Sequence, residues 1–227
     1  MSTQISVQLI DSMGSDLSVV NSARVSFAKV SEMDTSDPWG PWGPLKLKEK
    51  DAKLIRYLAK HKHLSPFNHT FVTFHIRAPI YVARQLQKHE YMPWNEVSKR
   101  YVDDTPELYE PEWRSRSVDK KQGSGGPMEI SLDSEMLYHA TCRNALTTYE
   151  RMIQEGVSPE QARSILPQNM MTQWYWSGTV GAVSKMCRLR CKEDTQYESR
   201  LVANQITEMM GKLYPVSWAA LMKGETE

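Results

Sequence analysis

An alternation of apolar and polar residues is the clearest pattern in this chain of 227 residues. Between residues 71 and 77, Val72, Phe74 and Ile76 would face a core, while the residues between them face the other way. This period of two predicts a strand with one buried face. Residues 5–10 repeat the pattern and predict a second strand.

Apolar residues spaced three and four apart predict helices elsewhere. Ser158-Pro159-Glu160-Gln161 forms a capping box with proline at the first helical position, and Pro79 marks another helix start. The other predicted helices cover residues 16–27, with Ser15 or Asp16 as the cap, 54–61, 80–89, 136–153 and 198–213. Because strands and helices do not alternate strictly, we expect an α+β fold with an antiparallel or mixed sheet packed against helices. The length fits a single domain over residues 1–227.

Two segments rich in glycine or proline interrupt these elements. Residues 34–44 hold three prolines and two glycines, and we expect a surface loop packed by Trp39 and Trp42. Its Pro-x-Gly rhythm is also compatible with a ligand motif. Residues 115–127 carry charges and then four glycines and serines, which predict a flexible surface loop within the domain.

Composition narrows the class of protein. Lys and Arg number 28 and Asp and Glu 27, a net charge of +1 that argues against nucleic-acid and membrane partners. No apolar run approaches the about 18–20 residues of a membrane helix, and we expect no secretory signal in the first residues. Three cysteines without a Cys-x-x-Cys pair favour the reducing cytoplasm over a disulfide framework.

Histidines and cysteines are the first candidates for chemistry. His63 and His69 would supply two metal ligands, but neither a Cys pair nor a His-Glu-x-x-His pattern accompanies them, so we expect no metal. His69 and His75 are equally suited to bonding a ligand or to solvent. Cys187 and Cys191 lie among cations, which suits either a nucleophilic thiol or an anion site beside it.

Several polar residues suit a bound phosphate, although neither G-x-G-x-x-G nor a P-loop occurs. Residues 85, 88 and 89 would share one face of a helix. The segment 94–101 packs an amide, a carboxylate, a hydroxyl and two cations into what we expect to be an extended loop after Pro93. The resulting anion site, suited to a nucleoside phosphate, would combine Gln85, Lys88, His89, that segment, Arg163 and Arg190.

One of these stretches has a characteristic order. Lys88-His89-Glu90 is followed, seven residues later, by Ser98 within Asn95-Glu96-Val97-Ser98-Lys99-Arg100-Tyr101. Further blocks lie at residues 23–27, 63–69 with 74–79 and 83–85, 162–167 and 188–190. Together they resemble the flavin-dependent thymidylate synthase family, the ThyX type, which carries Arg-His-Arg, seven residues and Ser. The resemblance spans about residues 5–220, and its ordered blocks make chance a poor explanation.

The resemblance implies a ThyX-like fold and a methyltransferase that converts dUMP to dTMP by reductive methylation. Methylenetetrahydrofolate would give the carbon, reduced FAD would give the hydride, and NADPH would re-reduce the flavin. The family uses no cysteine nucleophile. Its members are homotetramers whose sites combine residues of several subunits.

The resemblance also implies two sets of binding residues. The nucleotide dUMP would contact Gln85, Lys88, Glu96, Ser98, Lys99, Arg100, Arg163 and Arg190. The flavin would contact His63, Ser65, Lys88, His89, Glu90, Glu96, Thr179, Gly181 and Lys185. Arg190 would be the catalytic residue, since it corresponds to the arginine that polarises the uracil ring.

The departures from the family lie on the flavin side. Lys88 keeps the charge of the first motif arginine without its bidentate geometry, and Glu90 reverses the charge of the second. An Asn-x-Arg pair of the family aligns with Thr179-Val180-Gly181, and a later Asn aligns with Lys185, whose charge would compensate. We therefore expect a retained nucleotide site and a rebuilt or weakened flavin site.

These departures leave two alternatives to thymidylate synthesis. Loss of hydride transfer, motivated by Glu90 and Gly181, would leave a pyrimidine nucleotide hydroxymethylase with the same fold. The other alternative is a catalytically inactive homologue that binds a nucleotide. A nucleic-acid partner would require a basic footprint, which the net charge of +1 does not favour.

Overall fold

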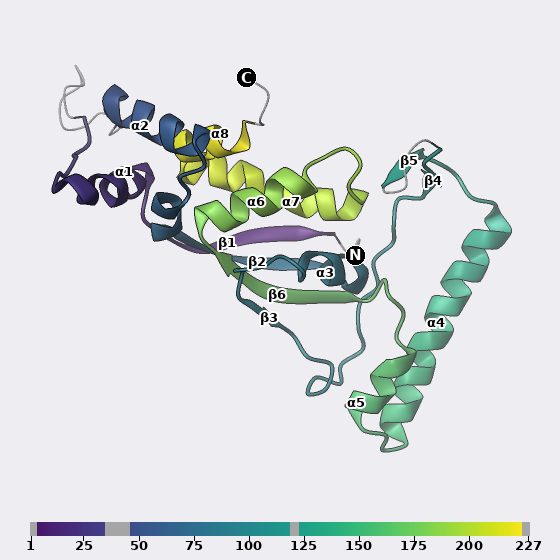
Figure 1. The fold of residues 1–227 in the computed structure, drawn as a ribbon. Coiled ribbons are helices and arrows are strands. Elements are labelled where there is room, and N and C mark those ends of the chain that lie inside the picture. The colour runs from purple at the N-terminus through teal and green to yellow at the C-terminus, as the bar shows by residue number, and fades with distance from the viewer. Residues whose placement is uncertain (1–3, 35–45, 119–122, 224–227) are drawn as a thin grey trace.

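A computed structural model of the chain describes residues 4–34, 46–118 and 123–223. Its central sheet has four antiparallel strands in the order β1–β2–β6–β3 (Figure 1). They are β1 (Ser6–Met13), β2 (Phe71–Pro79), β3 (Trp94–Glu96) and β6 (Met171–Gly178). A separate hairpin pairs β4 (Arg114–Arg116) with β5 (Ser124–Pro127).

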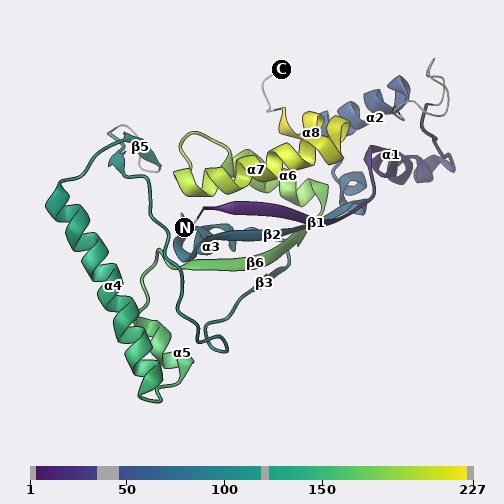
Figure 2. The ribbon, with the colours of Figure 1, turned by 180° about the vertical axis from the view of Figure 1, so that it is seen from behind.

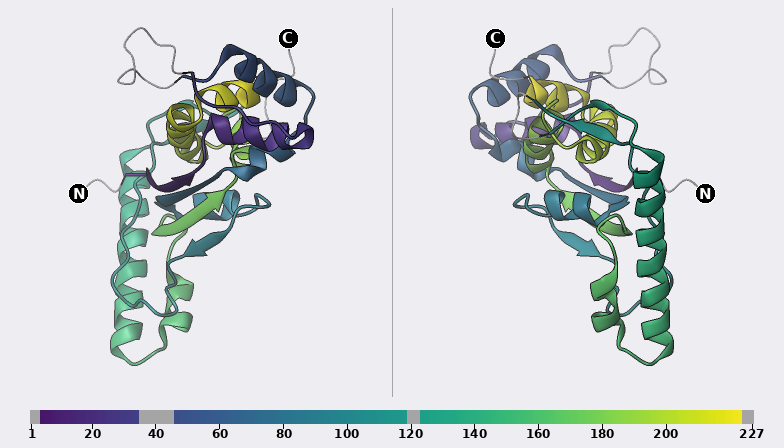
Figure 3. Two further views of the ribbon diagram at one scale, coloured as in Figure 1. Left: turned by 90° about the vertical axis from the view of Figure 1, so that its left-hand side faces the viewer. Right: turned by 90° about the vertical axis from the view of Figure 1, so that its right-hand side faces the viewer.

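Helices cover one face and the two ends of this sheet. They are α1 (Asp16–Arg24), α2 (Glu49–Lys60), α3 (Ile80–Leu86), α4 (Leu132–Gln154), α5 (Pro159–Ala162), α6 (Val180–Arg190), α7 (Tyr197–Leu213) and α8 (Pro215–Met222). Figure 2 shows α6 and α7 over one face of the sheet, with α1, α2 and α8 gathered at one end. Helices α4 and α5 stand away from the sheet as an arm (Figure 3). The expected α+β class, helices packed on an antiparallel sheet, is confirmed.

The core lies between the sheet and the α6–α7 layer. The pairing of β2 with β6 sets Phe74 opposite Trp176 and Ile76 opposite Trp174, and all four side chains are buried. These large rings and branched chains pack against apolar residues of both helices. The alternation over residues 71–77 therefore predicted the strand and its buried face correctly.

Several predicted elements differ from the observed ones. The helix predicted over 80–89 ends at Leu86, and the expected loop 94–101 begins with strand β3. The expected loop 115–127 contains strand β5 and most of β4; its residues 119–122 lie outside the described part, as do residues 35–45 of the other predicted loop. None of the described helices is long and apolar enough to cross a membrane.

The arm also differs from the prediction. Ser158 precedes α5 as expected, but its side chain makes no capping hydrogen bond, and α5 passes after four residues into the 3₁₀ turn Arg163–Ile165. In α4 the buried residues are Cys142 and Tyr149, whereas Leu137 of the predicted apolar face is 69% exposed. The arm therefore leaves apolar side chains uncovered within one protomer.

Asp16 joins two ends of the described chain. Ser15 is the N-cap residue of α1, one of the two expected caps. The buried carboxylate of Asp16 instead accepts hydrogen bonds from the backbone N–H groups of Val216 (2.9 Å) and Ser217 (2.8 Å), in the first turn of α8. These amides have no partner within their helix, so the carboxylate satisfies them and favours the helix dipole.

Candidate active site

Arg190 is the last residue of α6, and its guanidinium is fixed by α3 and the turn after it. Its Nε–H donates to Nε2 of His89 at 2.9 Å, and its Nη2–H donates to the backbone carbonyl of Gln85 at 3.3 Å. Both acceptors are uncharged, and among the described residues no carboxylate lies within ion-pair distance of Arg190. Partial burial lowers the pKa of Arg190 below its usual value. The group is therefore a positioned cation without a counter-ion in the described part of the chain.

His89 is held as a neutral acceptor. Burial, followed by the charges of Arg190 and Lys185, lowers the pKa of His89 to about 4. At neutral pH its Nε2 lone pair is therefore free to accept a hydrogen bond from Arg190. This hydrogen bond assigns the ring proton of His89 to Nδ1. The ring centroid lies 6.3 Å from that of the buried Trp176.

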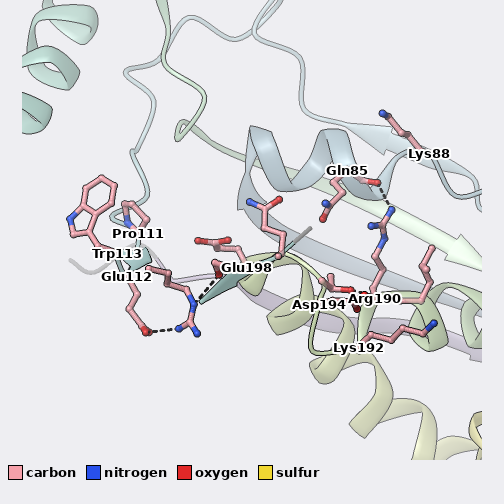
Figure 4. A pocket seen from close by; sticks show the side chains of 15 residues that line it. Gln85, Lys88, Pro111, Glu112, Trp113, Arg190, Lys192, Asp194 and Glu198 are labelled. Carbon is pink, nitrogen blue, oxygen red and sulfur yellow. Dashed lines mark hydrogen bonds and ion pairs between the residues drawn. The ribbon is translucent and has the colours of Figure 1, made fainter. Parts of the chain in front are cut away.

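The Arg190 guanidinium opens onto a cleft of about 740 Å³ (Figure 4). This volume lies in the range of small-molecule sites. Gln85 lines this cleft, and its Oε1 is buried without a hydrogen-bond partner in the described part of the chain. The lining consists of Gln85 and Lys88, Pro111 to Arg114, Gly123 and Ser124, Leu189, Arg190 and Lys192, and Asp194 to Gln196 with Glu198.

The far wall of the cleft is formed by the β4–β5 hairpin and the start of α7. Arg114 is bonded to Glu112 at 2.9 Å and lies over the ring of Tyr197, 4.4 Å from its centroid. Glu198 is buried. The burial of Tyr81, together with the nearby negative charge of Glu198, raises the pKa of Tyr81 well above its usual value. The far wall of the cleft thus carries both the Arg114 cation and the carboxylates of Glu112 and Glu198.

Arg100 and Arg163 form a second cluster, where the segment after β3 meets the arm. The Nε atom of Arg100 lies 3.5 Å from a carboxylate oxygen of Glu160, and that of Arg163 donates to the backbone carbonyl of Glu160 at 3.3 Å. Both arginines are exposed. Ser98 accepts from the backbone N–H of Arg100 at 3.3 Å. In the described ranges, no hydrogen bond or ion pair joins this cluster to Arg190.

Two expected nucleotide contacts are engaged locally. Glu96 accepts hydrogen bonds from Thr172 at 2.8 Å and from the indole of Trp94 at 3.2 Å. Lys99 is buried, and its ammonium donates to the backbone and side chain of Asp104 at 2.7 and 2.5 Å. The Lys99 charge is therefore used inside its own turn.

The expected flavin residues near α6 are arranged around Asn68. Thr179 is the N-cap residue of α6, accepts from the N–H of Ala182 at 3.2 Å and donates to Oδ1 of Asn68 at 2.8 Å. A Cβ atom on Gly181 would lie 2.5 Å from the same Oδ1. The arginine expected at this position in the family therefore has no room unless Asn68 moves. His63 and Ser65, just before Asn68, are exposed.

The residues present still fit an anionic dinucleotide such as FAD. Lys88 and Lys185 are exposed cations near His89. Lys88 precedes His89 in the sequence and lines the cleft, whereas Lys185 lies on α6, close enough for its charge to lower the pKa of His89. The N-terminus of α6, an 11-residue helix, adds a positive dipole end. Glu90 is exposed and opposes these charges. The donors for phosphate are thus supplied by lysines and a helix end in place of arginines.

Neither a metal nor a cysteine nucleophile is supported by this geometry. No group of three His, Cys, Asp or Glu side chains in the described part could hold a metal ion. Cys187 is buried on α6, which raises the pKa of its thiol. Cys191 is half-buried with its sulfur 3.4 Å from the hydroxyl of Thr207, and neither thiol lines the cleft.

Residues 8–216 match the family described as "Thymidylate synthase complementing protein". The chain belongs to this family. The flavin-dependent thymidylate synthase of Thermus thermophilus is 36% identical over 217 residues, which cover 94% of this chain and 74% of that protein. The enzyme of the same name from Kosmotoga olearia is 36% identical over 220 residues, 95% of this chain and 89% of that one. The resemblance expected from five blocks is confirmed.

Solved structures of another family relative agree in fold. The UMP/dUMP methylase PolB from Streptomyces cacaoi, bound with 5-Br dUMP, has a TM-score of 0.81 at 29% identity, covering 96% of this chain and 95% of that one. The same methylase bound with 5-Br UMP has a TM-score of 0.77 and covers 96% and 93%. The ThyX-like fold is therefore confirmed over nearly the whole chain.

The structure joins only some of the expected site residues. Gln85, Lys88 and Arg190 line one cleft, and His89 is bonded to Arg190 beside it, although α3 ends before Lys88 and His89. The contact of His89 with Arg190 was not expected, because 101 residues separate them and no local pattern signals the bond. Asn68 was also missed as a partner of the α6 N-terminus.

Proposed function

We propose that the protein catalyses the reductive methylation of dUMP to dTMP, with methylenetetrahydrofolate as carbon donor and NADPH as reductant. The observation that carries the proposal is Arg190, a cation that two neutral acceptors hold beside a nucleotide-sized cleft and that has no counter-ion among the described residues. Membership of the thymidylate synthase family makes the uracil ring the ligand to test first.

Arg190 suits a ring on which negative charge develops. A guanidinium has five N–H donors, and among the described residues Arg190 uses two of them, so three are available for a ligand in that part of the chain. Preorganised donors aimed at developing charge contribute a large part of catalysis. Gln85, whose buried amide oxygen has no hydrogen-bond partner among the described residues, would accept a ring N–H beside Arg190. Together they would orient the base and stabilise its anion.

The flavin proposal rests on the relatives named flavin-dependent and on the donors near α6. When bound, FAD would supply the hydride of the reaction. Lys88, Lys185 and the N-terminus of α6 would hold its phosphates, and the remaining candidates would contribute contacts around them. These are His63, Ser65, His89, Glu90, Glu96, Thr179 and Gly181.

We also propose that each site is completed by another subunit of a homotetramer in the cytoplasm, each subunit being one domain over residues 1–227. Arg100 and Arg163 lie in a cluster apart from Arg190, and a phosphate group would need both. The arm exposes Leu132 (69%), Met136 (61%) and Leu137 (69%). Such adjacent apolar side chains are typical of a surface that another subunit covers.

A second substrate is favoured by one comparison. PolB is described as a methylase of UMP as well as dUMP, and this chain covers 95% of that protein in the complex with 5-Br dUMP. The ribonucleotide UMP is therefore a candidate substrate here. Parallel turnover with UMP and dUMP measures the preference directly.

The decisive experiment begins with a titration of the purified protein with FAD, followed by flavin absorbance and fluorescence with and without dUMP. Turnover is then measured with FAD, NADPH, methylenetetrahydrofolate and dUMP, and the product is weighed by mass spectrometry. A methylated nucleotide supports thymidylate synthesis. A hydroxymethylated product would identify the hydroxymethylase alternative, and tight dUMP binding without any product would identify an inactive homologue.

A further inference from the structure

The orientation of Arg190 depends on one side chain. Of its two hydrogen bonds to described residues, the one that Nη2 donates to the backbone carbonyl of Gln85 is long, at 3.3 Å. The bond from Nε to His89 is shorter, at 2.9 Å, and fixes the plane of the guanidinium. His89 has its own support, because its backbone N–H donates to the Leu86 carbonyl at 3.1 Å and its ring lies against Trp176. A chain of contacts thus runs from the buried core to the guanidinium.

We propose that His89 is a positioning residue which holds Arg190 in its catalytic orientation, in addition to any contact it makes with a flavin. This inference rests on the proposed function, since the orientation matters only if Arg190 acts on a ligand. It assigns to His89 a role on the nucleotide side of the site. Without the imidazole acceptor, Nε of Arg190 would lose this partner, and the guanidinium beside the cleft would lose its fixed orientation.

The role requires a neutral imidazole, and the surroundings provide it. From α6, Arg190 and Lys185 face the ring with positive charge, and from β6 the apolar Trp176 packs on it. On its own segment His89 is flanked by Lys88 and Glu90, both exposed. Burial and the two cations hold the pKa of His89 near 4. Protonation would place an N–H on Nε2 opposite the N–H of Arg190 and break the bond.

Two substitutions separate positioning from packing. His89→Gln can keep an uncharged acceptor near the position of Nε2, whereas His89→Phe keeps a ring against Trp176 but removes the acceptor. We expect His89→Phe to lower kcat by about 100-fold, the effect of a misplaced catalytic group, with a smaller change in KM. His89→Gln should recover most of this loss. His61→Phe is the matched control, because that ring packs on Tyr57 at 4.2 Å in an exposed position.

Calorimetric binding of dUMP, FAD titration and thermal melting accompany the kinetics. If the wild-type protein turns over dUMP and the Phe variant is as fast, or if the Gln variant is as slow as the Phe variant, the inference is wrong and the proposed function stands. Equal FAD affinities across the three proteins would support it further, and a loss of activity explained wholly by weaker FAD binding would overturn it. A wild-type protein that neither binds nor converts dUMP would contradict the proposed function itself.

The pH profile gives an independent readout. Because His89 stays neutral down to about pH 4, the wild-type kcat should show no acid limb from this residue near pH 6.5, the ordinary pKa of histidine. His89→Gln removes the titrating group and should extend activity further into acid. An acid limb near pH 6.5 that disappears in His89→Gln would show a freely titrating imidazole and overturn the inference.

Discussion

Two arginines of the expected nucleotide site differ in how the protomer holds them. Arg190 is partly buried at the end of α6, and both of its acceptors are neutral groups of another segment. Arg163 is exposed on the arm, and its neighbour Arg100 lies 3.5 Å from the carboxylate of Glu160. The first arginine is preorganised within one chain, whereas the second lies among exposed surface partners that a ligand must displace.

This difference separates chemistry from recognition. A group that stabilises developing charge must not reorganise during the reaction. The hydrogen bonds from Arg190 to His89 and to the Gln85 carbonyl hold the guanidinium in place. A phosphate-binding group can be exposed, because binding a dianion offsets the loss of a weak surface ion pair. Substitution of Arg190 and substitution of Arg163 should therefore have different effects on kinetics.

The largest expected effect is that of Arg190→Ala. Removing one preorganised donor to developing charge should lower kcat by about 10²–10³-fold. Melting temperature should change little, because Arg190 takes part in no ion pair among the described residues. Arg190→Lys keeps the charge but loses the fork, and should recover only part of the activity. Parallel losses of melting temperature and kcat would make Arg190 a structural residue.

Arg163→Ala should act mainly on nucleotide affinity. Loss of one charge-assisted hydrogen bond of about 1.5–3 kcal/mol would raise the KM for dUMP by about 10–100-fold, with a smaller change in kcat. If subunits share sites, mixed oligomers of the Arg163→Ala and Arg190→Ala proteins, assayed at dUMP concentrations well below the raised KM, should be more active than either variant alone. An absence of recovery in refolded mixtures would place both arginines at a site of one protomer.

The pH dependence of stability tests whether His89 is neutral in the folded protein. The pKa of His89 is about 4 in the folded protein and near 6.5 in the unfolded chain, so the unfolded chain binds a proton that the folded one refuses. The free energy of unfolding should therefore fall as the pH falls from 6.5 to about 4. Above pH 6.5 His89 is neutral in both states and does not lower the free energy of unfolding. Denaturant titrations at several pH values should show a shallower fall for His89→Gln. Identical slopes would contradict the neutral imidazole.

The smallest expected effect is that of Glu160→Gln. Its ion pair with Arg100 is exposed on both sides, so the free energy of unfolding should change by less than about 1 kcal/mol. Removal of the carboxylate should slightly strengthen dUMP binding, and the gain should shrink in high salt. Calorimetry at two salt concentrations measures it. Weaker binding would mean that Glu160 orients the arginines instead of competing for them.

Sequence patterns predicted the elements whose two faces differ clearly. Strand β2 alternates strictly, and α2 and α7 have regular apolar stripes. Strand β6 was missed because Tyr175, on its open face, is itself aromatic and hides the alternation. The helix predicted over 136–153 is observed as α4, but its apolar spacing did not reveal which side chains are buried, since Leu137 is 69% exposed.

The site was predictable in its residue types but not in its contacts. The motif identified Gln85, Lys88, His89 and Arg190, and the structure places them together. The inward turn of Lys99 and the fit of Asn68 over Gly181 depend on packing between distant segments. Such contacts leave no periodic signal in a single sequence.

The contacts of the Asp16 carboxylate have a consequence for folding during synthesis. Its two partners follow it by 200 and 201 residues, and the Tyr214 hydroxyl donates to the Met13 carbonyl at 3.0 Å across a similar distance. Nascent chains emerge from the ribosome in sequence order, and contacts of such separation form late. Until these partners have been synthesised, the helical covering of this end is missing. We therefore expect the final closure of the fold to occur only after residues 214–217 have left the ribosome.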